Sequence, residues 1–198
     1  ELGKTLRYEG NFEQAEDILK RALEIRNRLA TKNFLARHKV AETLHELGIL
    51  ATRKHSLDDA ADFLQQALSL RRKLERDSPS KEIEAQCAST LYQLATVYVA
   101  RKPPLLDEAE SFFAEAIEAW QERFGRDRID LAEIYANAGV LAYRRGHLVA
   151  AAEQTRQALA IYRAVYTDED HYLVASCLHN LGIIERDRGN TGLALGLL

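Results

Sequence analysis

The sequence predicts an all-α solenoid, a right-handed stack of about five helix-turn-helix repeats, and three observations lead to this fold class. The 198 residues are 46% hydrophobic, with only three prolines and ten glycines, a composition that favours a folded and largely helical chain. A short phrase recurs along the chain at nearly even steps. Alanines placed seven residues apart follow most copies of that phrase.

The recurring phrase is clearest as LHELG at 44–48 and as LHNLG at 178–182. Less similar copies lie before and between these two, and each copy ends with a small residue. The small residues follow one another at steps of 45, 47, 44 and 43 residues, which is typical of an internal repeat. They are Gly3, Gly48, Ala95, Gly139 and Gly182.

A second signal of small residues follows each copy of the phrase. Two alanines seven residues apart share one face of a helix. They allow two helix backbones to approach closely, since a larger side chain would force the pair apart at a cost of roughly 1–3 kcal/mol. The first alanines are Ala15, Ala60, Ala109, Ala151 and Ala194, and the second are Ala22, Ala67, Ala116 and Ala158.

Turn-like residues such as Gly10 and Asn11 separate the two signals, so each repeat is a helix, a short turn and a helix. Ser56 and Asp59 have the spacing of a capping box that starts a helix. We predict first helices near 1–9, 34–53, 80–101, 129–145 and 170–188, and second helices near 12–30, 57–75, 105–123, 148–166 and 191–198.

These helices predict one domain, because a single helix pair cannot bury its apolar face and the copies must stack. The chain opens on Glu1 rather than a methionine and stops within the pattern, so we expect a fragment of a longer protein. The predicted solenoid spans 1–198, with repeats near 1–30, 34–75, 80–123, 129–166 and 170–198, the first and last being partial.

At this point the pattern resembles the tetratricopeptide repeat (TPR), which has a small residue late in its first helix and two alanines seven apart in its second. Repeats of 43 to 47 residues exceed the commonest length of 34 and look like those of kinesin light chains. The segments RALEIRNR at 21–28 and EDHYLVASCLHNLG at 169–182 carry this closer resemblance. Two departures are Tyr172, where a proline is expected, and the longer third turn, KPPLL at 102–106.

The charge and the hydropathy pattern exclude several functions. A formal net charge of −3 provides no sequence-wide positive field, so we expect no nucleic acid partner. No run of about 18 apolar residues occurs and no signal-peptide layout opens the chain, so we expect no membrane insertion and a cytoplasmic location. Cys87 and Cys177 have no partners at metal-ligand spacing and are predicted to be reduced and buried.

The sequence contains no catalytic constellation. His45 and Glu46 are not followed by the second histidine that a helical zinc protease needs. The glycine-rich segment GNTGLALG at 189–196 lacks the lysine of a phosphate-binding loop. We therefore expect no enzyme activity, no catalytic residues, no metal and no cofactor.

The resemblance implies a peptide-binding groove, because in TPR proteins the first helices line a concave surface. Residues at the second, fifth, sixth, ninth, twelfth and thirteenth positions of each repeat point into it. Apolar or small polar residues occupy the ninth position, as Ile49, Thr96, Val140 and Ile183. The predicted peptide-contact residues are His45, Glu46, Arg53, Tyr92, Gln93, Asn137, Tyr143, Arg144, His179, Asn180 and Arg186.

Amide side chains at the sixth position suit an extended peptide, because each offers a donor and an acceptor to the peptide backbone. Such bonds contribute only about 0.5–1.5 kcal/mol each, so several must act together. The alternative is that Asn137 and Asn180 bond to a neighbouring helix. The carboxylate clamp of some TPR proteins is excluded, because Tyr92, Thr96 and Ser176 stand among its positions and its cations are missing.

Basic residues recur at the ends of the first helices, where contact with the helix C-terminal dipole is favourable. They are Lys54, Arg101, Arg145 and Arg188.

The sequence therefore predicts a non-catalytic scaffold or adaptor module that binds an extended peptide or linear motif of a partner protein. An alternative is a regulatory or oligomerisation arm that packs on a missing nucleotide-binding or enzymatic domain, or self-associates through its ends. A third interpretation is a bacterial peptide-pheromone sensor, which predicts an attached helix-turn-helix.

Overall fold

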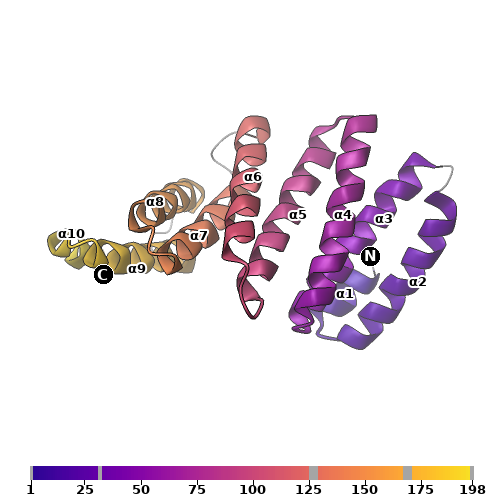
Figure 1. Cartoon of the computed structure of the whole chain (residues 1–198), viewed down its shortest axis with the longest axis horizontal. Coiled ribbons are helices and arrows are strands. Elements are labelled where there is room, and N and C mark those ends of the chain that lie inside the picture. Colours follow the sequence, from indigo (N-terminus) through magenta and orange to yellow (C-terminus); the bar gives the residue numbers. More distant parts are fainter. Residues whose placement is uncertain (1, 31–32, 125–128, 167–170, 197–198) are drawn as a thin grey trace. The chain divides into compact units, whose positions relative to one another are not determined.

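The computed structural model describes residues 2–30, 33–124, 129–166 and 171–196. Over these residues the chain forms ten α-helices and no β-strand (Figure 1). The helices belong to two compact units, residues 1–105 and 106–198.

Unit 1 contains five helices, and each packs on the next along the chain. The first helices of the predicted repeats are α1, α3 and α5, and α3 also contacts α5 directly. The second helices, α2 and α4, pack against them, so the unit has two layers. Its helices are α1 (Leu2–Tyr8), α2 (Phe12–Ala30), α3 (Phe34–Arg53), α4 (Leu57–Asp77) and α5 (Lys81–Ala100).

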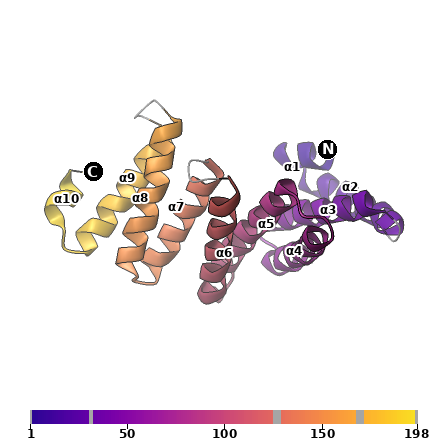
Figure 2. The ribbon, with the colours of Figure 1, turned by 90° about the horizontal axis from the view of Figure 1, so that it is seen from above.

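Unit 2 follows the same rule of packing between consecutive helices, and here α7 contacts α9. Figure 2 shows α7, α8 and α9 side by side, and α8 packs against both of its neighbours. The first helices α7 and α9 therefore form a two-helix face. The helices are α6 (Leu106–Phe124), α7 (Ile129–Arg144), α8 (Leu148–Val165), α9 (Tyr172–Asp187) and α10 (Thr191–Leu195).

The predicted all-α architecture of helix pairs is confirmed, and most helix ends fall within two residues of their predicted positions. The third predicted repeat has its first helix in unit 1 and its second in unit 2, with the boundary inside the longer turn at 102–106. Predicted residues 1, 170 and 197–198 lie outside the described residues. One continuous right-handed solenoid with these repeat boundaries stays a prediction.

The alanines of the repeat lie at the contacts between helices, as predicted. The first alanine of each of the first four repeats is fully buried, and so are most of the second alanines, while Ala22 is half-buried. A helix packs closest where its side chains are smallest, so these positions fix where each pair of helices crosses. The fully buried alanines are Ala15, Ala60, Ala109, Ala151, Ala67, Ala116 and Ala158.

The glycines of the recurring phrase lie against a neighbouring helix. A Cβ atom added at Gly48 would lie 2.5 Å from Cγ of Leu64 and 3.3 Å from the carbonyl oxygen of Ala60. A Cβ atom at Gly139 would lie 2.7 Å from Oγ1 of Thr155. The structure thus leaves no room for a side chain at these two positions.

The turns inside the first, second, fourth and fifth repeats each use a left-handed backbone residue, for which glycine is the least strained choice. Gly146 and Gly189 have φ values of 77° and 84°, and His55 takes the same place with φ of 61°. The predicted cap by Ser56 is wrong, because its side chain makes no capping hydrogen bond to α4. A capping residue usually has an extended backbone, as Ser80 does with a ψ of 147°, and the hydroxyl of Ser80 caps α5. The ψ of Ser56 is only 71°, so its backbone does not have this conformation.

Substitution of Gly48 tests the close approach of α3 and α4. Gly48→Ala should lower the free energy of unfolding by roughly 1–3 kcal/mol, because the fully buried Leu64 cannot move aside from the added methyl group. The cost of this clash outweighs the better helix propensity of alanine. Gly192→Ala on α10 is the control, since no atom lies within 4 Å of its added Cβ. Urea unfolding of both variants provides the measurement. Equal stability of the two variants would contradict the close contact.

Candidate functional site

The predicted residue Glu46 lies in the contact between α1 and α3. Its side chain is buried, and Oε2 accepts a hydrogen bond from Nη2 of Arg7 at 3.0 Å. Nζ of Lys4 lies 3.7 Å from the other carboxylate oxygen and 2.8 Å from Glu42. These ion pairs hold α1 on α3, so the carboxylate of Glu46 has partners within the fold.

His45 belongs to a buried polar cluster that joins three helices of unit 1. Its Nδ1 lies 3.3 Å from Nη1 of Arg71 on α4 and 3.3 Å from Oγ1 of Thr90 on α5. Arg71 also donates to the carbonyl of Gln86 at 2.7 Å. Burial, reinforced by the positive charge of Arg71, lowers the pKa of His45 to about 3, so the imidazole is neutral at pH 7.

A similar arginine contact occurs one repeat earlier in the chain. Arg26 on α2 donates to the hydroxyl of Thr43 and, at 3.2 Å, to the carbonyl of Lys39 on α3. Thr43 and Thr90 occupy the same repeat position, as do Arg26 and Arg71. In unit 2 the arginine position carries Trp120 and Tyr162, both buried, so an aromatic ring replaces the guanidinium.

The other predicted residues of unit 1 lie on α3 and α5. Tyr92 and Gln93 are half-buried, and Arg53 is exposed. The guanidinium carbon of Arg53 lies 5.9 Å from the centre of the Tyr8 ring. Their role in peptide binding stays a prediction.

Unit 2 contains an apolar cleft between its two first helices. The cleft has a volume of about 90 Å³. Buried Thr155 of α8 lies at its base, while α7 and α9 supply its walls. Two of the predicted contact residues meet here, together with two residues of the ninth position. The lining residues are Val140, Tyr143, Thr155, Asn180, Ile183 and Ile184.

The two asparagines of unit 2 have different surroundings. The side chain of Asn137 donates a hydrogen bond to the carbonyl of Glu133, one turn earlier in its own helix, at 2.9 Å. Asn180 lines the cleft, and its amide makes no hydrogen bond to any residue that the structure describes. Asn180 is therefore the amide that a ligand in the cleft would meet.

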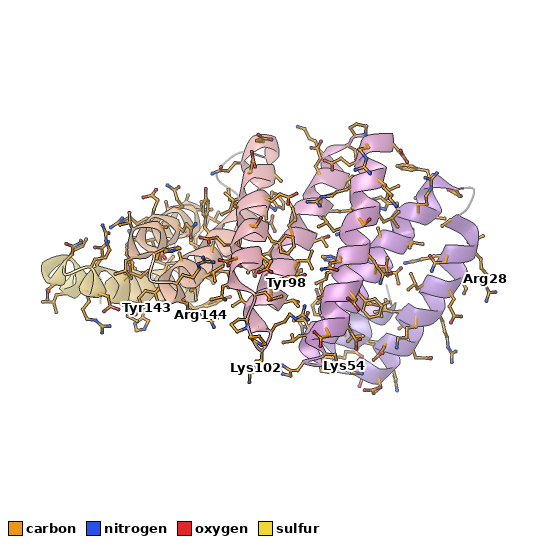
Figure 3. All side chains as sticks on the ribbon, in the orientation of Figure 1. Arg28, Lys54, Tyr98, Lys102, Tyr143 and Arg144 are labelled. Atoms are coloured by element: carbon orange, nitrogen blue, oxygen red, sulfur yellow. The ribbon has the colours of Figure 1, made fainter. Side chains whose placement is uncertain are left out.

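A hydrogen bond closes one end of this cleft. Oη of Tyr143 on α7 donates to Oδ2 of Asp187 on α9 at 2.6 Å, and Arg186 lies 2.8 Å from the same carboxylate. The hydrogen bond raises the pKa of Tyr143, and the bonds from Tyr143 and Arg186 lower the pKa of Asp187. Arg144 is exposed beside Tyr143 at the end of α7 (Figure 3), and His179 is also exposed.

A second hollow lies between the N-terminal halves of the same two helices, and sequence reasoning missed it. It has a volume of about 280 Å³. Two signals could have indicated it: Glu133 stands at the second position of its repeat, and Tyr172 replaces an expected proline. The lining residues are Ile129, Asp130, Glu133, Tyr162, Tyr172 and Leu173.

The basic residues at the ends of first helices form ion pairs that the dipole argument did not predict. Lys54, labelled in Figure 3, lies 2.9 Å from Glu13 and 2.6 Å from Glu16 on α2. Arg145 lies 2.6 Å from Asp107 on α6. These pairs join a first helix to the preceding second helix, so the basic charges are compensated within the fold.

Over residues 2–30, 33–124, 129–166 and 171–196, no group of three or more His, Cys, Asp or Glu side chains is placed to hold a metal ion. None of the helices in these ranges is long and apolar enough to cross a membrane. Cys87 and Cys177 are buried, as predicted, and neither forms a disulfide. Burial raises the pKa of Cys177 to about 11.

Helix pairs that stack through small residues, with first helices sharing one face, define a helical repeat protein. The tetratricopeptide repeat family profile matches residues 1–73 and 86–164, and the chain belongs to this family. No curated protein matches the sequence.

Solved structures share the fold. BtubC (BKLC) from P. vanneervenii is 24% identical, with a TM-score of 0.82, over 100% of this chain and 74% of that one. Nearly identical TPR-like repeats of a putative kinesin light chain from Podosopora anserina are 16% identical, with a TM-score of 0.75, over 99% and 88%. YrrB, a TPR protein with an unusual peptide-binding site, is 19% identical, with a TM-score of 0.62, over 98% and 78%. These likenesses show a fold of the kinesin light chain type.

The low pKa of His45 predicts a loss of stability in mild acid. Between pH 6.5 and 3 the unfolded chain binds a proton at His45 that the folded chain does not, so stability falls as the pH is lowered, by at most about 1.4 kcal/mol per pH unit. Lys4 and Arg7 also disfavour the charged ring, while Glu42 favours it.

Urea unfolding at pH 7.5 and pH 5 measures this effect. The unaltered chain should lose roughly 1–2 kcal/mol more than His45→Gln between the two values. The exposed His179 provides the matched control, and His179→Gln should keep the pH dependence of the unaltered chain. An unchanged pH dependence in His45→Gln would show that the buried ring does not cause it.

Proposed function

We propose that this chain is a non-catalytic interaction module that binds an extended peptide of a partner protein on the α7 and α9 face of unit 2. One observation carries the proposal: the amide of Asn180 lies in an apolar cleft without a hydrogen-bond partner in the described structure. A peptide backbone satisfies both the donor and the acceptor of such an amide.

The size and lining of the cleft suit one aliphatic side chain of the peptide. A volume of about 90 Å³ holds roughly three to four heavy atoms, since a water molecule occupies about 30 Å³. Val140 is 42% exposed and Ile183 is half-buried, so a ligand would remove their apolar surface from water. The peptide would bury one side chain and form a few backbone hydrogen bonds, and each of these bonds would contribute only modestly to the binding free energy.

The family supports a role in protein recognition, and YrrB, which has this fold, contains a peptide-binding site. We infer that the module acts as a scaffold or adaptor. The expected cytoplasmic location and the protein partner belong to this proposal.

A library of random twelve-residue peptides on an array, followed by fluorescence anisotropy of the best binder, tests the proposal. Asn180→Ala should weaken binding by about 2- to 12-fold, the equivalent of one net hydrogen bond. Asn137→Ala should weaken it less, because its amide already bonds to Glu133. Asn27→Ala on the exposed surface of α2 is the matched control. Equal affinity of Asn180→Ala and the unaltered chain would refute the site.

A further inference from the structure

A hollow of unit 1 is lined by basic side chains at the edge where the turns between helices lie. It is formed by the turn before α4 and by the turn that follows α5, and we call it the turn hollow. Its volume is about 670 Å³, within the range of roughly 300–1,000 Å³ that is typical of ligand pockets. Its lining includes His55, Leu57, Asp58, Arg101, Lys102 and Leu105.

The turn after α5 brings a lysine to this hollow. It is the lengthened turn of the third repeat, and the turns of the other repeats are shorter. The backbone amide of Leu105 donates to the carbonyl of Tyr98 at 3.0 Å, and two prolines fix two φ angles of the turn. Lys102 is exposed on this turn (Figure 3), and its ammonium group makes no hydrogen bond or ion pair with any residue that the structure describes.

His55 contributes an imidazole from a strained backbone position. Its φ of 61° is left-handed, and the turns of the first, fourth and fifth repeats have glycine in this conformation. Histidine tolerates this region better than most residues, but glycine would avoid the strain. The side chain of His55 is exposed and makes no hydrogen bond within the described part of the chain. A strained residue whose side chain has no partner in the fold points to a role in binding.

Arg101 is held in place by the fold itself. Its Nη2 donates to Oδ1 of Asp58, and its guanidinium carbon lies 5.7 Å from the centre of the buried Tyr98 ring. Asp58 uses one of the five N–H donors of the guanidinium, which makes no other hydrogen bond to the residues that the structure describes. A side chain fixed in this way loses little conformational freedom when a ligand binds.

The charges around the turn hollow favour an anion. Arg101 and Lys102 carry two positive charges, and the carboxylate of Asp58 carries one negative charge. The C-termini of α3 and α5 oppose an anion and the N-terminus of α4 favours it, each by the equivalent of about half a charge. The helix ends together therefore remove about half of one positive charge, and a positive balance remains.

A phosphate monoester fits this lining better than a carboxylate does. It carries about 1.5–2 negative charges at pH 7 and three acceptor oxygens, and three side chains with N–H donors line the hollow. A guanidinium also binds phosphate in a bidentate manner. Leu57 and Leu105 give the hollow an apolar wall for the carbon atoms of a ligand.

We infer that the turn hollow binds a phosphate monoester, carried by a phosphorylated serine or threonine of a partner protein. This site lies in unit 1 and uses none of the residues of the cleft proposed in unit 2. Either site can therefore be refuted without the other.

Fluorescence anisotropy at low salt with a labelled Gly/Ala peptide that has one central phosphoserine tests the inference. The phosphopeptide should bind about 10-fold or more tightly than the same peptide with serine, because it adds charge-assisted hydrogen bonds. It should also bind more tightly than the peptide with glutamate, and inorganic phosphate should compete with it. Tighter binding of AMP than of the phosphopeptide would overturn the assignment to a protein segment.

Charge variants locate the binding at the turn hollow. Lys102→Gln should weaken binding of the phosphopeptide by about 2- to 5-fold, as expected for an exposed ion pair. Asp58→Asn should strengthen binding by a similar factor, because it removes a negative charge while its amide oxygen still accepts from Arg101. Lys73→Gln on the exposed surface of α4 changes the net charge as Lys102→Gln does and should leave binding unchanged.

His55→Gly separates binding from a structural role of the imidazole. Glycine relieves the strain at this position, so the midpoint of urea unfolding should not fall, while phosphopeptide binding should weaken by about 2- to 5-fold. A lower midpoint would show that the imidazole supports the fold instead. Equal affinities of Lys102→Gln and Lys73→Gln, or no binding of the phosphopeptide at millimolar concentration, would refute the phosphate site.

Discussion

The close approach of paired helices at residues without bulky side chains is the constraint on which the rest of this structure depends. At Gly48 and Gly139 a single added carbon would collide with the neighbouring helix, and most of the repeat alanines on the second helices are fully buried. These positions fix the crossing point of each pair, so residues at a given repeat position face similar surroundings in successive repeats. The proposed binding face of unit 2 depends on this alignment of α7 with α9.

Substitutions at registered positions then change the chemistry without changing the packing. The position that carries Arg26 and Arg71 in unit 1 carries Tyr162 in unit 2. In unit 1 the guanidinium bonds to a threonine and a backbone carbonyl of the next helix. In unit 2 a buried ring stands there, beside two carboxylates, and borders a hollow. One repeat interface is thus closed by polar contacts, while another has a buried ring that borders a hollow.

The sequence predicts the helices and their contacts well, because small residues and turn glycines act locally and recur at a fixed period. It also predicts that Tyr143 and Asn180 share one face, and the structure brings them into one cleft. The sequence does not predict which long polar side chains pair across a helix interface. The pairing of Glu46 with Arg7, or of His45 with Arg71, depends on which side chains reach across an interface. The hollow beside Tyr162 was missed for the same reason, since it combines residues from first and second helices.

The most direct test is a ¹⁵N NMR titration of the 198-residue chain with the peptide from the array that binds most tightly. The account predicts that amide shifts change at residues lining the apolar cleft on α7 and α9, around Val140 and Ile183, while amides of α2 and α4 stay unchanged. Shift changes confined to the second helices, or spread over unit 1 with none on α7 and α9, would contradict it.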